Sequence, residues 1–206
     1  IRIEYGQSDA AGNVYVTATE DEEGNREHFE YHREEKYTVH RNHSGVVEKI
    51  RYDDKHRTVK EEKADGGVIV YEYDEKGNKK RVIENGLATN YEYDRRGNCI
   101  SIRYADGSRE VFRYNERDQK TYAQERDGVT AEWVYDSAGR CVEVRRNGVR
   151  IWEGVYDGSG RLTASKEADL GQKRYSYDAN DFVASMSVNE NGRELSERYT
   201  HDEIGR

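Results

Sequence analysis

The chain has 206 residues, of which 37% are charged and 33% hydrophobic, and its formal net charge is −8. An acidic balance with interspersed charges excludes nucleic acid as the expected ligand, because phosphate binding needs clustered Lys and Arg. No stretch approaches 18 apolar residues and Ile1 leads directly into charged sequence, so we expect no membrane insertion and no signal peptide. Seventeen Tyr, three Phe and two Trp favour a folded chain over a disordered one.

The string Tyr-Asp-x-x-Gly-Asn/Arg recurs along the sequence. The clear copies begin at Tyr73, Tyr93, Tyr135 and Tyr156, degenerate copies begin at Tyr31, Tyr52, Tyr114 and Tyr177, and the outer copies at Ser8 and His201 have a substituted first residue. The steps from Tyr31 to Tyr177 are each about 21 residues, a period typical of repeat architectures. About ten copies, starting near Ser8, therefore predict a single domain over residues 1–206 with no linker.

A second turn signal lies halfway through each copy, as at Asn85-Gly86, Asp106-Gly107 and Asn147-Gly148. Asn-Gly and Asp-Gly between alternating runs are the strongest short hairpin signals, because Gly accepts a positive φ. Each copy then holds two turns and two strands of about six residues. The sequence predicts an all-β fold, an antiparallel repeat array of β-hairpins of about 21 residues each, with no helix.

The Asp and the Gly of each string are predicted to form the turn. The carboxylate accepts backbone N–H groups two or more residues on, and the Gly takes the left-handed conformation. The residues assigned this structural role are Asp9, Gly12, Asp53, Asp74, Gly77, Asp94, Gly97, Asn115, Asp136, Gly139, Asp157, Gly160, Asp178, Asp202 and Gly205. Asp118 and Asp181 replace Gly in two copies, and Glu35 and His56 replace it in the second and third copies, where they predict looser turns.

Aromatic residues alternate with polar ones in the strands before these turns, which places the rings on one face. The predicted aromatic ladder comprises Phe29, Tyr31, Tyr52, Tyr71, Tyr73, Tyr91, Tyr93, Phe112, Tyr114, Trp133, Tyr135, Tyr156, Tyr175, Tyr177 and Tyr199. Ten copies give about 20 strands, and open sheets rarely exceed about 10 strands without curling. We therefore expect a curved or spiralling sheet with the aromatic face inside.

The Tyr-Asp-x-x-Gly-Arg/Asn string at a step near 21 resembles the YD repeat of RHS proteins, insecticidal toxin complexes and teneurins. The resemblance covers roughly residues 8–206 and implies a segment of a longer shell that encloses or presents a polypeptide, either a toxin cargo or an adhesion partner. It also implies a secreted or cell-surface protein without enzymatic activity. The chain departs from the full pattern because it has no Pro, and so lacks the Pro-containing core that closes long shells.

Catalytic, metal and cofactor sites are not expected. An acidic residue that recurs in every copy is expected to have a structural role in the repeat. His28 and His32 are four residues apart on a strand and so lie about 13 Å apart, too far to bind the same metal ion. Cys99 and Cys141 lie two copies apart, or roughly 19 Å, which predicts free thiols.

One break in the ladder suggests a binding site. Trp152 is out of phase, with Gly154 where an aromatic is expected, and together with Trp133 it marks a candidate groove. The alternative function, which the aromatic ladder allows, is a free-standing module that binds a glycan or a protein through its concave face, including an immunity-type protein that neutralises a toxin. Unpaired edge strands also suggest edge-to-edge self-association.

Overall fold

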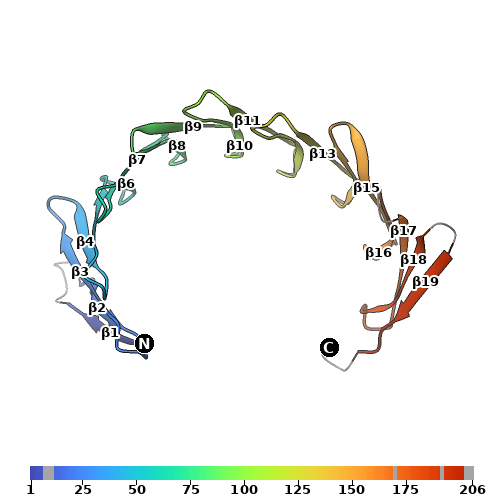
Figure 1. Cartoon of the computed structure of the whole chain (residues 1–206), viewed down its shortest axis with the longest axis horizontal. Coiled ribbons are helices and arrows are strands. Elements are labelled where there is room, and N and C mark those ends of the chain that lie inside the picture. The colour runs from blue at the N-terminus through green and yellow to red at the C-terminus, as the bar shows by residue number, and fades with distance from the viewer. Residues whose placement is uncertain (7–11, 169–170, 191–192, 202–206) are drawn as a thin grey trace. The chain divides into compact units, whose positions relative to one another are not determined.

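A computed structural model describes residues 1–6, 12–168, 171–190 and 193–201, and these residues form nineteen β-strands and no helix (Figure 1). The strands belong to one antiparallel sheet. The all-β repeat array of hairpins is thereby confirmed, with nineteen strands where about twenty were expected.

The strands are β1 Arg2–Tyr5, β2 Val16–Glu20, β3 Arg26–His32, β4 Tyr37–Arg41, β5 Val47–Tyr52, β6 Thr58–Glu62, β7 Val68–Tyr73, β8 Lys79–Glu84, β9 Leu87–Tyr93, β10 Cys99–Arg103, β11 Arg109–Tyr114, β12 Lys120–Gln124, β13 Thr130–Tyr135, β14 Cys141–Arg146, β15 Val149–Tyr156, β16 Leu162–Glu167, β17 Gly171–Tyr177, β18 Val183–Glu190 and β19 Arg193–Arg198.

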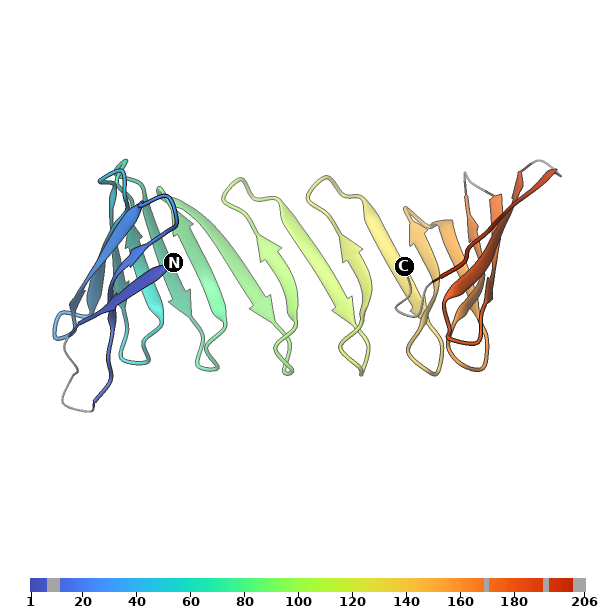
Figure 2. The ribbon, with the colours of Figure 1, turned by 90° about the horizontal axis from the view of Figure 1, so that it is seen from below.

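The chain divides into two compact units. The first comprises residues 1–92 with 102–107, and its strands β1 to β8 each pair with the next strand in sequence. The second comprises residues 93–101 with 108–206, and its strands β11 to β19 pair in the same sequential way. Within each unit the turns lie at the two ends of the strands (Figure 2).

A bulge marks the end of most strands that finish in Tyr. In β7, Glu72 faces Arg81 but Tyr73 faces Lys79, so one residue of β8 has no direct partner. The same shift precedes Tyr52, Tyr114, Tyr135, Tyr156 and Tyr177. A type I turn followed by a left-handed residue produces this bulge in a hairpin. The repeat string therefore sets both the turn and the register of the strands that follow.

The sheet has very few fully buried residues. Among the described residues, the only hydrophobic ones that are buried are Ala18 and Ala123, and no large side chain is fully buried. Aromatic rings instead lie half-buried against small or aliphatic side chains on the neighbouring strand, as Phe112 does opposite Ala123 and Trp133 opposite Val144. Stability therefore comes from main-chain ladders and from ring packing within one layer.

Candidate functional site: the Tyr-Asp corners and the Trp152 hollow

In most Tyr-Asp corners, each defined as the Tyr and the five residues that follow it, one aspartate closes the turn. Two backbone hydrogen bonds join Asp74 to its turn. The Asp74 N–H donates to Asn78 O at 2.9 Å, and the Gly77 N–H donates to Asp74 O at 3.1 Å. The Asp74 carboxylate also accepts the backbone N–H of Asn78 at 2.8 Å. Gly77 has a φ of 94°, in the left-handed region that favours glycine. The sequence prediction of an Asx-type turn describes this arrangement.

The same bonds recur in the other corners. The predicted residues that accept the backbone N–H four positions on are Asp53, Asp94, Asn115, Asp136, Asp157 and Asp178. The predicted glycines Gly12, Gly97, Gly139 and Gly160 have a positive φ. Asp118 and Asp181 take that conformation in the copies without Gly. Asp9, Asp202 and Gly205 lie outside the described residues.

The predicted loose turns need correction. The third corner is closed like the others, because His56 adopts the left-handed conformation with a φ of 58° and donates its N–H to Asp53 O at 3.0 Å. In the second corner, Lys36 and not Glu35 is left-handed, with a φ of 56°. His32 pairs there with Tyr37 without a bulge, because a His at the Asp position supplies no side-chain oxygen to accept the backbone N–H that closes the five-residue turn.

The residue after the Gly has a role that sequence reasoning missed. Its side chain donates to the second carboxylate oxygen of the Asp, as Asn78 Nδ2 does to Asp74 Oδ2 at 2.9 Å and Arg140 Nε does to Asp136 Oδ2 at 2.7 Å. Arg140 also reaches the next corner, where its Nη1 donates to Asp157 O at 3.1 Å. The recurrence of Asn or Arg at this position was the available signal.

The Tyr of five corners also has a partner that sequence reasoning missed. The Tyr73 hydroxyl donates to Thr58 O at 2.7 Å, fifteen residues earlier. The same fifteen-residue bond joins Tyr31 to Val16, Tyr135 to Lys120, Tyr156 to Cys141 and Tyr177 to Leu162. Each acceptor is the first residue of the strand that follows the preceding corner, so each of these hydroxyls ties two neighbouring copies together.

The corner aspartates make stability depend on pH. The amide side chain of Asn78 lowers the pKa of Asp74, and that of Asn98 lowers the pKa of Asp94, each from an ordinary value of 3.8. A carboxyl whose pKa is lower in the folded chain stabilises the fold above its unfolded pKa. That stabilisation is lost as the pH falls through the folded pKa. The folded array should therefore lose stability below about pH 4.

Replacing Asp74 and Asp94 together by Asn should reduce this acid sensitivity. Asn keeps an oxygen for the backbone N–H, as Asn115 already shows with Gln119 N at 3.1 Å, but it does not titrate. We expect a smaller loss of stability between pH 7 and pH 3 than in the unmodified chain, measured by urea denaturation at both values. The control, Glu22→Gln with Glu116→Gln, removes two exposed acids and should keep the original pH dependence. Equal acid sensitivity in both variants would show that Asp74 and Asp94 are not the source of the pH dependence.

The predicted aromatic ladder lies along the strands that lead into the corners. Most of its rings are half-buried, whereas Tyr31 and Tyr199 are 37% and 38% exposed. Cations lie over several of the rings. The Arg57 guanidinium is 4.4 Å from the centre of the Tyr73 ring, and Arg161 is 4.9 Å from that of Tyr177. Each of these arginines belongs to the preceding corner, so the contact adds a second link between copies.

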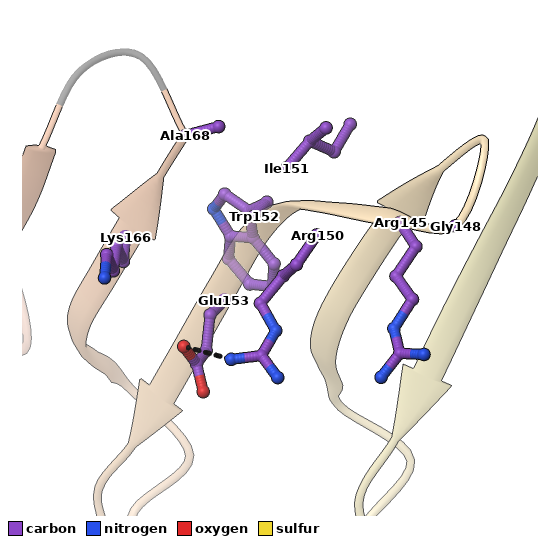
Figure 3. Close-up of a pocket in the computed structure, with 8 residues that line it drawn as sticks. All are labelled: Arg145, Gly148, Arg150, Ile151, Trp152, Glu153, Lys166 and Ala168. Atoms are coloured by element: carbon purple, nitrogen blue, oxygen red, sulfur yellow. Dashed lines mark hydrogen bonds and ion pairs between the residues drawn. The ribbon is translucent and has the colours of Figure 1, made fainter.

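A hollow of about 370 Å³ opens beside Trp152, on β14 to β16 (Figure 3). Its lining residues are Arg145, Gly148, Arg150, Ile151, Trp152, Glu153, Lys166 and Ala168. Carboxylates already hold the Arg150 guanidinium, with Nε 2.9 Å from Glu143 Oε2 and Nη1 3.2 Å from Glu153 Oε2. The hollow is a charged depression with one aromatic wall.

The out-of-phase position of Trp152 has a packing explanation. A Cβ built on Gly154 would lie 2.2 Å from Trp152 Cη2, so the indole ring covers the glycine. Gly154 and its cross-strand partner Ser165 are both buried. Trp152 thus supplies the ring that position 154 lacks, as aromatic residues do for glycines in sheets. Trp133 faces Val144, which in turn faces Trp152, and Trp133 is not among the residues that line the hollow. A binding role for these two residues stays a prediction.

The two thiols and the His, Asp and Glu side chains are the remaining candidates for chemistry among the described residues. Cys99 and Cys141 are free, as predicted, and burial raises the pKa of both thiols. Within the described ranges, no three His, Cys, Asp or Glu side chains gather in a way that suits a metal ion. No helix long and apolar enough to cross a membrane occurs in the part of the chain that the structure describes.

Two family models match most of the chain. The family model for the teneurin YD-shell matches residues 23–151, and that for the RHS repeat matches residues 156–194. No curated protein matches the chain.

Several solved structures share the fold. The crystal structure of TcdB2-TccC3-TEV matches with a TM-score of 0.70 and 14% identity, over 96% of this chain and 12% of that one. Those of TcdB2-TccC3-Cdc42 and of TcdB2-TccC3 without its hypervariable C-terminal region match with TM-scores of 0.69 and 0.68 and 15% identity, each over 95% of this chain and 12% of the other. The chain thus spans about an eighth of the length of the structures it matches.

Proposed function

Because the chain belongs to the teneurin YD-shell family, we propose that it is a section of the wall of a YD-repeat shell that encloses or presents a polypeptide. The role is architectural and needs no catalytic group. A secreted or cell-surface location follows from the same proposal, since the family resemblance is to toxin complexes and cell-adhesion proteins.

The observation that carries this proposal is the link between neighbouring corners. Five copies bond to the copy before them through the Tyr hydroxyl, as in Tyr156 to Cys141 O at 2.9 Å. A bond to the copy after comes from the residue that follows the left-handed position, as in Gln119 Nε2 to Gly139 O at 2.6 Å. Since the contacts run only between neighbours, the sheet extends copy by copy without needing a second layer. Such a single-layered sheet is best suited to act as a barrier.

The relatives supply the kind of partner. The similar structures are complexes named TcdB2-TccC3, one of them solved without a hypervariable C-terminal region. We infer that the wall formed by this chain faces a polypeptide segment of a larger protein or complex. A backbone with its hydrogen bonds satisfied within the sheet presents side chains, and not unpaired main chain, to that segment.

Protease protection in the complete protein that carries residues 1–206 tests the proposal. We expect trypsin to leave an enclosed polypeptide intact in the unmodified protein. A variant with Tyr135, Tyr156 and Tyr177 replaced by Ala should expose that polypeptide to cleavage, because it loses three links between copies.

The control is Tyr5→Ala, which removes a tyrosine that is 60% exposed and lies outside the corners. It should leave protection unchanged. Digestion of every segment outside the repeats at the same rate in all three proteins would overturn the proposal, because a wall that shields nothing is not a shell.

A further inference from the structure

The second Tyr-Asp corner leaves a space that an arginine fills in three of the other corners. In three of those corners an Arg after the Gly position lies over the ring of the next corner's Tyr: Arg57 over Tyr73, Arg140 over Tyr156 and Arg161 over Tyr177, at 4.4 to 5.0 Å from the ring centres. In the second corner the corresponding residue is Lys36, and its ammonium contacts the Asp54 carboxylate. Among the described residues, no cation lies over the ring of Tyr52, the tyrosine that follows this corner.

A hollow of about 380 Å³ occupies this place, within the first unit. Its walls are tyrosines: Tyr15 and Tyr31, whose ring centres are 5.2 Å apart, with Tyr37 and Tyr52. Thr38, 6% exposed, also lines it. The volume is in the range of about 300–1,000 Å³ that is typical of small-molecule sites.

Charged groups of both signs surround these rings. Arg33 lies 3.9 Å from the centre of the Tyr15 ring, and Lys36 pairs with Asp54. Asp53 also lines the hollow, with its carboxylate paired to Arg57. A cationic guest would meet Arg33 and Lys36, and an anionic guest would meet Asp53 and Asp54. The charges therefore favour a neutral guest.

A purely hydrocarbon guest also fits poorly, because it would cover charged groups without offering them hydrogen bonds. A pyranose ring meets both requirements. Its C–H face is apolar and stacks on an aromatic ring, and its edge carries hydroxyl groups that both donate and accept. Tyrosine suits such a contact, because it joins a flat apolar body to a polar tip.

We propose that the hollow between the second and third corners binds a neutral pyranose unit of a glycan. The sugar stacks on Tyr52, at the ring left without a cation, and its hydroxyls bond to Asp54 and Lys36 at the rim. This site is separate from the Trp152 hollow, where the lining carries three cationic side chains, Arg145, Arg150 and Lys166, against one carboxylate.

Titration of the 206-residue chain with methyl glycosides of glucose, galactose and N-acetylglucosamine tests the proposal, followed by NMR shifts of backbone amides. We expect saturable binding of at least one glycoside with a Kd on the order of 1 mM. The shifts should centre on residues 31–38 and 52–56. Lysine amide and acetate serve as the cationic and anionic probes and should not saturate.

Four variants make the test specific. Tyr52→Ala should weaken binding at least tenfold, whereas Tyr52→Phe keeps the stacking ring and should retain it. Asp54→Ala removes a rim carboxylate whose side chain is 87% exposed, so it should weaken binding several-fold without disturbing the fold. Tyr177→Phe, in a corner where Arg161 covers the ring, is the matched control and should bind as the unmodified chain does.

Absence of saturable binding by all three glycosides would overturn the proposal, as would binding that neither Tyr52→Ala nor Asp54→Ala weakens. Saturation by lysine amide or acetate alone would overturn it too, because the hollow would then select charge. None of these outcomes bears on protease protection, so the failure of this site is distinguishable from the failure of the shell proposal.

Discussion

Replacing Gly154 by Ala is expected to displace the Trp152 ring from the sheet. The new Cβ would lie 2.2 Å from Cη2 and 2.8 Å from Cζ2 of the indole, closer than non-bonded carbon atoms approach. Because the ring must move and uncover the small residues beneath it, we expect a loss of about 1–3 kcal/mol in the free energy of unfolding. Urea denaturation followed by Trp fluorescence measures both effects when Trp133 is first replaced by Phe. The emission of Trp152 should then shift to the red in the native state.

Gly158→Ala is the matched control for this variant. A Cβ at Gly158 meets no atom within 4 Å, and Gly158 is not among the glycines with a positive φ. Its stability and native emission should stay close to those of the parent. If Gly154→Ala matched Gly158→Ala in both measurements, the ring would not rest on Gly154, and the explanation for the gap in the aromatic ladder would fall with it.

Replacing Tyr156 by Ala is expected to open the sheet locally between two copies. The change removes the hydrogen bond to Cys141 O at 2.9 Å and the half-buried ring over which Arg140 lies. We expect a loss of about 2–3 kcal/mol, since a fully buried aromatic costs more and a single hydrogen bond costs less. Amide hydrogen exchange should quicken first in β14 to β16, because contacts in a repeat array run between neighbours.

Tyr156→Phe separates the hydroxyl from the ring. It should cost about 1 kcal/mol, the usual contribution of one hydrogen bond. Tyr122→Phe is its control, since among the described residues the Tyr122 hydroxyl reaches only Gln124 Oε1, at 3.5 Å, and it should have almost no effect. Equal effects of the two Phe variants would show that the bond to Cys141 O does not stabilise the array.

The sequence was sufficient to predict the all-β hairpin array and most of its turn chemistry. Both depend on residues within five positions of one another. The carboxylate of Asp74 closes a turn on Asn78, and Gly77 relieves the backbone in between. Hydrogen bonds between residues this close in the chain can be inferred from a short sequence motif. Repetition at a step of about 21 residues then fixes where every hairpin lies.

What escaped prediction depends on register between strands. The partner of the Tyr73 hydroxyl lies fifteen residues earlier, on another strand, and no local pattern points to Thr58. Trp152 was misread for a different reason. Its ring covers Gly154, two residues along the same strand, and a gap in the aromatic pattern does not by itself show which neighbouring ring fills it. In the second corner, His32 replaced the Asp on which the prediction relied, and the left-handed residue moved from the Glu35 position to Lys36.

The fifteen-residue bond has a consequence for how such a gene changes length. Donor and acceptor both lie within the span of one repeat step, so a tandem duplication of one whole step copies both of them in phase. Every new junction then receives its tyrosine bond without any further substitution. Insertion of a single residue within a strand does the opposite, because it turns the following side chains to the other face. Arrays of this kind therefore gain or lose whole repeats. The number of repeats can change under selection while the contacts between neighbouring repeats stay the same.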